Sequence, residues 1–143
     1  MNYNKLKKKI LNLLMINGNK KTSEKLLLKS FKKFQKKFYK KNLKHLIKVG
    51  VVNSSPILFL KTIKRSRKRS MEFPFLLNTH LRLFYGIKSI IKSCSSKKIK
   101  SFYLSFETEF INSVKNTSLS VYKKKELYQE ASIKKKFANY RWF

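Results

Sequence analysis

Clusters of lysine and arginine are the residues of this sequence whose types and spacing can do chemistry, and that chemistry is the binding of anions. Runs of three lysines include Lys7–Lys9 and Lys123–Lys125, and a segment from Arg65 to Ser70 holds four cations. The 143 residues include 36 Lys and Arg against six acidic residues, which gives a formal net charge of +30. Protein surfaces normally mix both signs of charge. The excess therefore predicts a polyanionic partner, because each phosphate that a cation neutralises releases bound counterions.

Side chains suited to catalysis or metal binding are scarce. His45 and His80 are the only histidines, Cys94 is the only cysteine, and three glycines provide no glycine-rich phosphate loop. We therefore expect no enzyme activity, no metal and no cofactor, and we expect His45 to lie on a helix surface or contact a phosphate. Because Cys94 falls on an apolar stripe, we expect it to be a small core residue.

The overall composition favours one compact domain once the charge is neutralised. Hydrophobic residues make up 42% of the chain, with 12 Phe and 7 Tyr. No apolar run approaches the roughly 18 residues of a membrane-spanning helix. Phe, Tyr, Met, Ile, Asn and Lys together supply 75 of the 143 residues, a bias typical of an AT-rich, often organellar genome. Helical periodicity begins at Leu6, so we expect no cleavable presequence.

Apolar residues recur at helical spacing in three segments before Pro56, which predicts three helices. The first ends at Gly18, the second begins at Thr22 or Ser23 with Glu24 in its first turn, and the third follows Asn42. Residues 53–56 stop the third helix. The predicted inward-facing sets are Leu6, Ile10, Leu13 and Leu14; Leu27, Phe31, Phe34 and Phe38; and Leu43, Leu46, Ile47 and Val51.

Between about residues 57 and 77 the pattern changes from helical to alternating, which predicts two strands joined by the basic tip at 65–70. Pro74 cannot donate a hydrogen bond to a neighbouring strand, so its strand must lie at an edge. The natural arrangement is an isolated two-stranded hairpin. Such a ribbon is marginally stable alone and must rest on helices or on a partner.

Three further helices are predicted after the hairpin. Asn78 and Thr79 cap the first, and the last begins near Tyr122 and runs to the aromatic tail at 140–143. Their inward-facing sets are Leu83, Ile87, Ile90 and Cys94; Ile99, Tyr103, Phe106 and Phe110; and Leu127, Ala131 and Ala138. The fold class is therefore mainly α: a single six-helix domain over residues 1–143 with one protruding basic β-hairpin.

Two segments, Leu14–Glu24 (LMINGNKKTSE) and Phe137–Trp142 (FANYRW), resemble the small-subunit ribosomal protein seven family. The hairpin at 64–74 and the basic run at 123–126 fall where that family has a basic hairpin and a basic helix start. The resemblance covers nearly the whole chain. Arg67 and Lys68 stand where the family has a glycine pair at the hairpin tip, which makes this tip more cationic.

The resemblance implies a structural constituent of the small ribosomal subunit that binds small-subunit rRNA, nucleates assembly of the head, and presents its hairpin toward exit-site tRNA and the mRNA path. It implies neighbouring small-subunit proteins as partners. Together with the composition it suggests a mitochondrial location, with a plastid as the alternative. The implied rRNA contacts are Lys7, Lys8, Lys9, Lys20, Lys21, Arg82, Lys123, Lys124, Lys125 and Arg141. The implied RNA contacts of the hairpin are Arg65, Arg67, Lys68 and Arg69.

Two other classes of protein also use lysine-rich helices: DNA-compacting proteins of organellar nucleoids and cationic membrane-active proteins. A membrane-active protein predicts one strongly segregated helix, whereas several helices here have apolar faces suited to packing on one another. The DNA-compacting alternative lacks a recognisable groove-reading motif.

Overall fold

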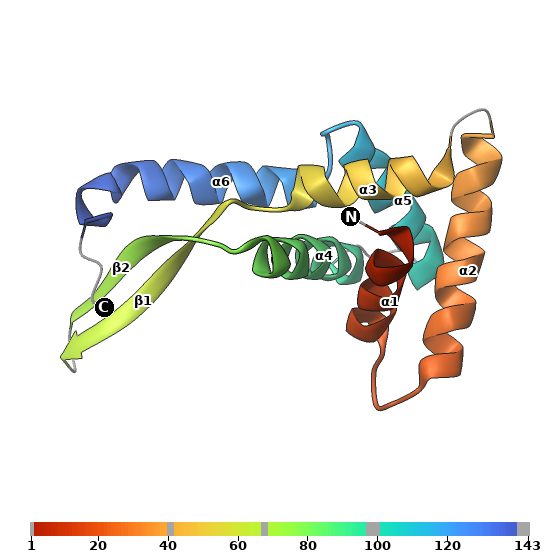
Figure 1. Cartoon of the computed structure of the whole chain (residues 1–143), viewed down its shortest axis with the longest axis horizontal. Helices are drawn as coiled ribbons and strands as arrows, with labels where there is room; N and C mark the ends of the chain where they lie inside the picture. The colour runs from red at the N-terminus through yellow and green to blue at the C-terminus, as the bar shows by residue number, and fades with distance from the viewer. Residues whose placement is uncertain (1, 40–41, 67–68, 97–100, 140–143) are drawn as a thin grey trace.

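The computed structural model describes residues 2–39, 42–66, 69–96 and 101–139. Its helices are α1 (Tyr3–Leu14), α2 (Lys20–Lys37), α3 (Leu43–Ser54), α4 (Thr79–Ser95), α5 (Phe102–Val114), α6 (Leu119–Ile133) and the short 3₁₀ helix η1 (Lys135–Phe137). Strands β1 (Leu58–Ser66) and β2 (Arg69–Leu76) form the hairpin between α3 and α4. The predicted six α-helices and antiparallel hairpin are confirmed for this part of the chain. The molecule is elongated, with α1 and α2 at one end and the hairpin at the other (Figure 1).

The apolar core lies among α1–α5 and is built mainly from the stripes that the sequence predicts. It also buries Leu11, which was not predicted, whereas some predicted members are only half-buried against it: Leu13, Leu14, Phe38, Leu43 and Leu83. Aromatic rings occupy its centre: Phe34 and Phe106 each pack against Phe110, with ring centroids 6.4 and 5.0 Å apart. Fully burying one side chain of this size contributes about 1.5–3 kcal/mol. The buried members are Leu6, Ile10, Leu11, Leu27, Phe31, Phe34, Leu46, Ile47, Val51, Ile87, Ile90, Cys94, Phe106 and Phe110.

Helix boundaries near the N-terminus correct two predictions. Helix α1 ends at Leu14, and Gly18 instead lies in the turn to α2 with a φ of +73°, a backbone conformation that glycine adopts without steric cost. Helix α2 begins at Lys20, because the Asn19 carbonyl accepts the first helical bond from the Ser23 amide at 3.3 Å. The same carbonyl also accepts bonds from the hydroxyls of Thr22 and Ser23 at 2.7 and 2.8 Å. The first turn of α2 therefore contains no acidic residue, and Glu24 lies in the second turn.

The last helix also differs from the prediction at both ends. It begins at Leu119, three residues before Tyr122, because the Ser118 hydroxyl caps it by accepting a bond from the Val121 amide at 3.2 Å. It ends at Ile133 and gives way to η1, so Ala138 lies beyond both helices and is only half-buried. Ala131 is buried as predicted, and Leu127 is half-buried. The predicted tail at 140–143 and Ile99 lie outside the described residues.

The hairpin rests on α6 and η1, as its marginal stability alone requires. Strand β1 pairs antiparallel with β2, and Pro74 lies opposite Leu60 on an edge strand. The Phe73 ring packs edge-on against Phe137 with centroids 5.9 Å apart, and Lys134 forms an ion pair with Glu72. At the base of the hairpin the Ile57 amide donates to the Tyr128 hydroxyl at 2.8 Å.

Candidate nucleic-acid interface

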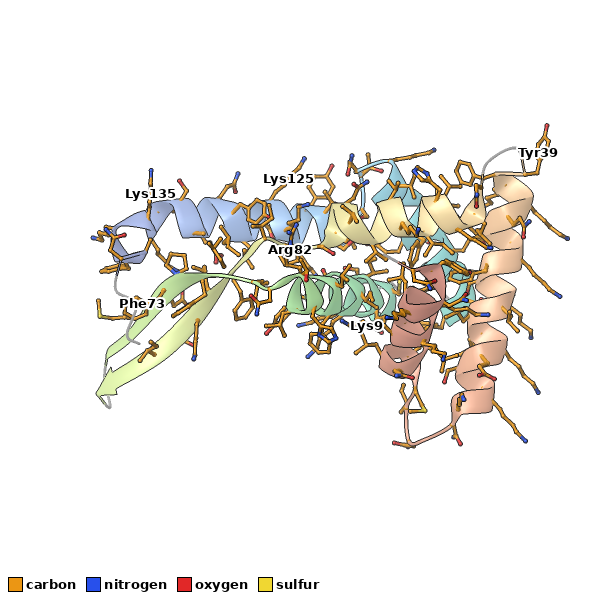
Figure 2. All side chains as sticks on the ribbon, viewed as in Figure 1. Lys9, Tyr39, Phe73, Arg82, Lys125 and Lys135 are labelled. Carbon is orange, nitrogen blue, oxygen red and sulfur yellow. The ribbon has the colours of Figure 1, made fainter. Side chains whose placement is uncertain are left out.

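Arg82 of α4 and Lys124 of α6 are the two predicted rRNA-binding residues that the fold brings into one cationic site. Arg82 follows the hairpin in the first turn of α4 and lies between α4 and the line formed by α3 and α6 (Figure 2). The positive charge of Arg82 reaches Lys124 strongly enough to lower its pKa. Within the described residues, the Arg82 Nε is buried and has no hydrogen-bond partner. We call this pair the Arg82–Lys124 site.

The end of α3 holds Lys124 in place. The Lys124 Nζ donates to the backbone carbonyl of Asn53 at 2.6 Å, and the Asn53 side-chain amide donates to the Ser113 carbonyl at 3.0 Å. Asn53 thus connects the last turn of α3 to both α5 and α6. An ammonium group has three donors, so Lys124 keeps donors for a further acceptor.

A buried group of serine hydroxyls fixes the start of α6 against α3 and α5. The Ser120 hydroxyl lies 3.0 Å from that of Ser54 and 2.8 Å from that of Ser118. The Ser113 hydroxyl lies 3.3 Å from that of Ser54 and 3.2 Å from that of Ser118. The Glu109 carboxylate, which is 0% exposed, accepts from the Ser120 amide at 3.1 Å. These bonds satisfy donors at the N-terminus of α6 and so position Lys124 one turn later.

The electrostatics of the Arg82–Lys124 site favour an anion. Burial lowers the pKa of Lys124 below the ordinary 10.5, and repulsion from Arg82 lowers it further. Among the described ion pairs, none involves Arg82 or Lys124. A phosphate between them would relieve the repulsion, since arginine offers a planar bidentate fork and lysine a compact charge.

Lys9 occupies a different environment from its neighbours in the first lysine run. Its Nζ donates to the backbone carbonyl of His80 at 2.8 Å, which ties α1 to the start of α4 (Figure 2). Burial lowers the pKa of Lys9. Lys8 is exposed and Lys7 is half-buried on the same helix. Lys9 therefore has a structural partner already, whereas Lys8 projects into solvent.

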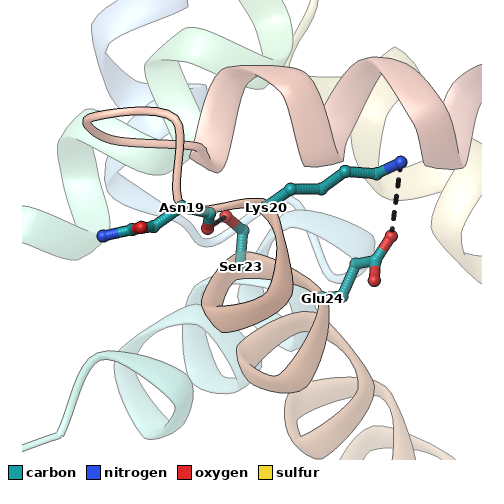
Figure 3. Close-up of polar contacts among 4 residues, drawn as sticks. All are labelled: Asn19, Lys20, Ser23 and Glu24. Carbon is teal, nitrogen blue, oxygen red and sulfur yellow. Dashed lines mark hydrogen bonds and ion pairs between the residues drawn. The ribbon is translucent and has the colours of Figure 1, made fainter.

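Lys20 and Lys21 lie at the exposed start of α2. Lys20 forms an ion pair with Glu24 one turn later, with 3.9 Å between Nζ and Oε1, and both side chains are largely exposed (Figure 3). Such exposed pairs contribute little and leave the lysine accessible.

Lys123 and Lys125 flank Lys124 on α6 and are exposed. Because α6 begins at Leu119, this run lies in the second turn and does not open the helix as predicted. In the hairpin, Arg65 belongs to β1 and Arg69 to β2, next to the tip. Arg67, Lys68 and Arg141 lie outside the described residues. The individual contacts implied for all these residues remain predictions.

Sequence reasoning did not identify the residues that hold Lys124 and the start of α6 in position. Asn53 and Ser54 were expected only to stop α3, yet they bind Lys124 and the serine group. Glu109 sits on α5 among aromatic residues and shows no sequence signal for a capping role. A Ser-x-Ser pair at 118 and 120, at the start of α6, is a local signal for a helix cap but gives no sign of the contacts with Ser54 and Ser113. His45 is exposed on α3 and Cys94 is buried in the core, as expected.

Comparisons with known proteins identify a family and relatives of this chain. A family described as ribosomal protein S7p/S5e matches residues 1–135. The small ribosomal subunit protein uS7 of Wigglesworthia glossinidia brevipalpis is 28% identical over 134 residues, which cover 94% of this chain and 85% of that protein. The small ribosomal subunit protein uS7m of Reclinomonas americana is 28% identical over 134 residues, with 94% and 83% covered. The uS7 protein of a Desulfitobacterium hafniense strain is 25% identical over 139 residues, with 97% and 88% covered.

A basic helical fold with a hairpin and a paired cationic site defines a nucleic-acid-binding protein. More particularly, this chain belongs to the ribosomal protein S7p/S5e family, which confirms the resemblance seen in its sequence. The DNA-compacting and membrane-active alternatives gain no support. Over the ranges that the structure describes, no helix is both long and apolar enough to cross a membrane.

Proposed function

We propose that this chain is a structural constituent of the small ribosomal subunit that binds small-subunit rRNA, with one backbone phosphate held at the Arg82–Lys124 site. The observation that carries the proposal is the buried, unpartnered Nε of Arg82 beside a second cation, in a protein of a ribosomal family. Leaving a buried charged donor unpaired is costly, and a phosphate oxygen would pair it. Small-subunit rRNA and neighbouring small-subunit proteins are the partners.

A double-mutant cycle tests this site. Arg82→Gln and Lys124→Gln each remove one hydrogen bond to a charged group, worth about 1.5–3 kcal/mol, so each should weaken rRNA binding about tenfold or more. If both side chains bind one phosphate, the two effects should not add. The double variant should then bind rRNA with nearly the same affinity as the single variant that binds less tightly. The log–log salt slope should then fall by only about 0.7–0.9, the value for one contact.

Lys88→Gln and Lys115→Gln provide the matched control, because both lysines are exposed and lie outside the site. Their double variant loses the same formal charge as the Arg82–Lys124 double variant. Affinity at 0.15 M salt should stay near that of the wild type. Equal weakening of the two double variants would mean that charge alone, and not this site, determines binding.

We further propose that the chain nucleates assembly of the subunit head and that its hairpin faces exit-site tRNA and the mRNA path. The support is the family resemblance and the projection of the hairpin away from α1–α5 (Figure 1). Replacing Arg65, Arg67, Lys68 and Arg69 with Ser removes four cations. The variant should enter subunits normally but retain less tRNA or mRNA. Failure to enter subunits, with normal retention in the few that form, would contradict this orientation.

We infer a mitochondrial location from the AT-rich composition and from the similarity to uS7m of Reclinomonas americana. The uS7 protein of a bacterium is equally similar at 28% identity. Sedimentation of small subunits from purified organelles tests the inference. The chain should co-sediment with mitochondrial small subunits in high salt, and recovery with plastid or cytosolic subunits would overturn it.

A further inference from the structure

Helix α2 lies at the end of the molecule opposite the hairpin (Figure 1). A line of exposed lysines runs along it. The members follow one another at intervals of four, four, three and four residues, which places them on one helical face. All five are exposed. The opposite face of α2 is buried through Leu27, Phe31 and Phe34. We call the five residues the α2 lysine stripe: Lys21, Lys25, Lys29, Lys32 and Lys36.

The lysines of the stripe are regularly spaced and suit an anion with repeated charges. With a rise of about 1.5 Å per residue, neighbouring lysines lie about 6 Å apart along a face about 22 Å long. Like charges at these spacings destabilise a helix by about 0.2–0.5 kcal/mol for each pair. The described ion pairs of α2 join Lys20 to Glu24 and Lys37 to Glu107, so they leave the stripe uncompensated. A row of phosphates would compensate it.

We propose that the α2 lysine stripe binds the sugar–phosphate backbone of an rRNA segment distinct from the one at the Arg82–Lys124 site. This inference rests on the proposed function and adds a second RNA contact to it. Helix α2 packs on α1 and α5, whereas Lys124 lies on α6, which runs toward the hairpin (Figures 1 and 2). The two sites therefore face different parts of the bound RNA.

The composition of the stripe favours RNA over an acidic protein. Protein–protein interfaces are depleted in lysine and enriched in aromatic residues and arginine. The stripe contains lysine only, and lysine is a strongly hydrated point charge suited to phosphates without shape-specific contacts. A nucleic-acid backbone also presents repeated negative charge along the whole length of such a face. An acidic protein segment is the alternative outcome of the test.

Directed cleavage from tethered iron tests the location. The only natural cysteine, Cys94, is 2% exposed, so a reagent attached to an introduced cysteine reports on that position alone. Lys29→Cys in the stripe and Lys123→Cys next to the Arg82–Lys124 site should both cut small-subunit rRNA in assembled subunits, at different nucleotides. Cuts from position 123 without cuts from position 29 would overturn the stripe proposal alone. An absence of cuts from both would overturn the proposed function.

Removal of charge tests the contribution to binding. Lys25, Lys29, Lys32 and Lys36 changed together to Gln should lower the log–log salt slope by about 2.8, at about 0.7 per phosphate contact. The control changes Lys92, Lys115, Lys135 and Lys136 to Gln, four exposed lysines outside both sites. The control should lower the slope by less than about 0.7, the value for one phosphate contact. Equal slopes in the two variants, or cross-linking of position 29 to a protein instead of RNA, would overturn the proposal.

Discussion

Two regions of this molecule differ in how each is stabilised. One is the body of α1–α5, and the other is the arm formed by the hairpin, α6 and η1. The buried apolar cluster that runs through α1–α5 contains no residue of the hairpin or of α6 within the described ranges. The arm buries Phe73, Val121 and Ala131. It meets the body through the stacked rings of Phe59 and Tyr85, whose centroids are 4.9 Å apart, and through polar links such as the bond from the Ile57 amide to the Tyr128 hydroxyl. The body therefore holds most of the buried apolar side chains of the described residues, and its packing should contribute most of the hydrophobic stabilisation.

The largest expected effect comes from a cavity in the body. Phe34→Ala removes a ring that is 1% exposed and packs against Phe38 and Phe110. The free energy of unfolding should fall by about 3–5 kcal/mol, measured by chemical denaturation followed by helical circular dichroism. Phe38→Ala, at the half-buried end of α2, is the comparison and should cost clearly less. Equal losses at the two positions would show that the body is not packed as described.

A second change should affect the arm alone. Phe73→Ala removes the edge-on contact with Phe137, and such aromatic pairs contribute about 0.5–1.5 kcal/mol beyond area burial. Because Phe73→Ala also loses the burial of the ring, amide hydrogen exchange should accelerate by about tenfold or more across β1 and β2, while protection in α2 and α5 stays unchanged. Equal acceleration in α2 would show that the two regions unfold together.

The pH dependence of binding sharpens the comparison at the boundary between the two regions. Burial and Arg82 lower the pKa of Lys124 below 10.5, so its charge is lost at a lower pH than that of ordinary lysines. As the pH rises, rRNA affinity should therefore begin to fall before the pH reaches 10.5. Lys124→Arg stays charged in this range and should abolish this loss of affinity. Between its lowered pKa and 10.5, Lys124 binds fewer protons in the folded, RNA-free protein than in the unfolded chain. The free energy of unfolding should therefore rise with pH in this range. Affinity curves that coincide for wild type and Lys124→Arg would count against the site.

The smallest expected effect concerns the exposed start of α2. Glu24→Gln breaks the ion pair with Lys20. The Lys20 side chain is 67% exposed and that of Glu24 is 45% exposed. The free energy of unfolding should change by only about 0.2–1 kcal/mol, and less at high salt. Denaturant midpoints at two salt concentrations provide the measurement. A larger, salt-independent loss would indicate that Glu24 has a role in the body beyond this pair.

The sequence was informative where periodicity governs structure and silent where distant polar residues meet. The apolar stripes around Phe34, Ile87 and Phe110 predicted the body, and alternation around Pro74 predicted the hairpin. The serine group could not be foreseen, because Ser54, Ser113 and Ser120 come from three helices and serine alone resembles a helix stop. Arg82 and Lys124 were both predicted contacts, but their convergence depends on how α4 packs beside α6.

The end-to-end arrangement of α3 and α6 makes them a strut between the two ends of the molecule (Figure 1). Their 12 and 15 residues correspond to about 40 Å at 1.5 Å per residue. Each helix resists bending through its continuous ladder of hydrogen bonds, whereas the joint between them is spanned by the serine hydroxyls and the Lys124–Asn53 bond. A force applied at the hairpin therefore travels along the strut and is taken up first at this joint, beside the Arg82–Lys124 site.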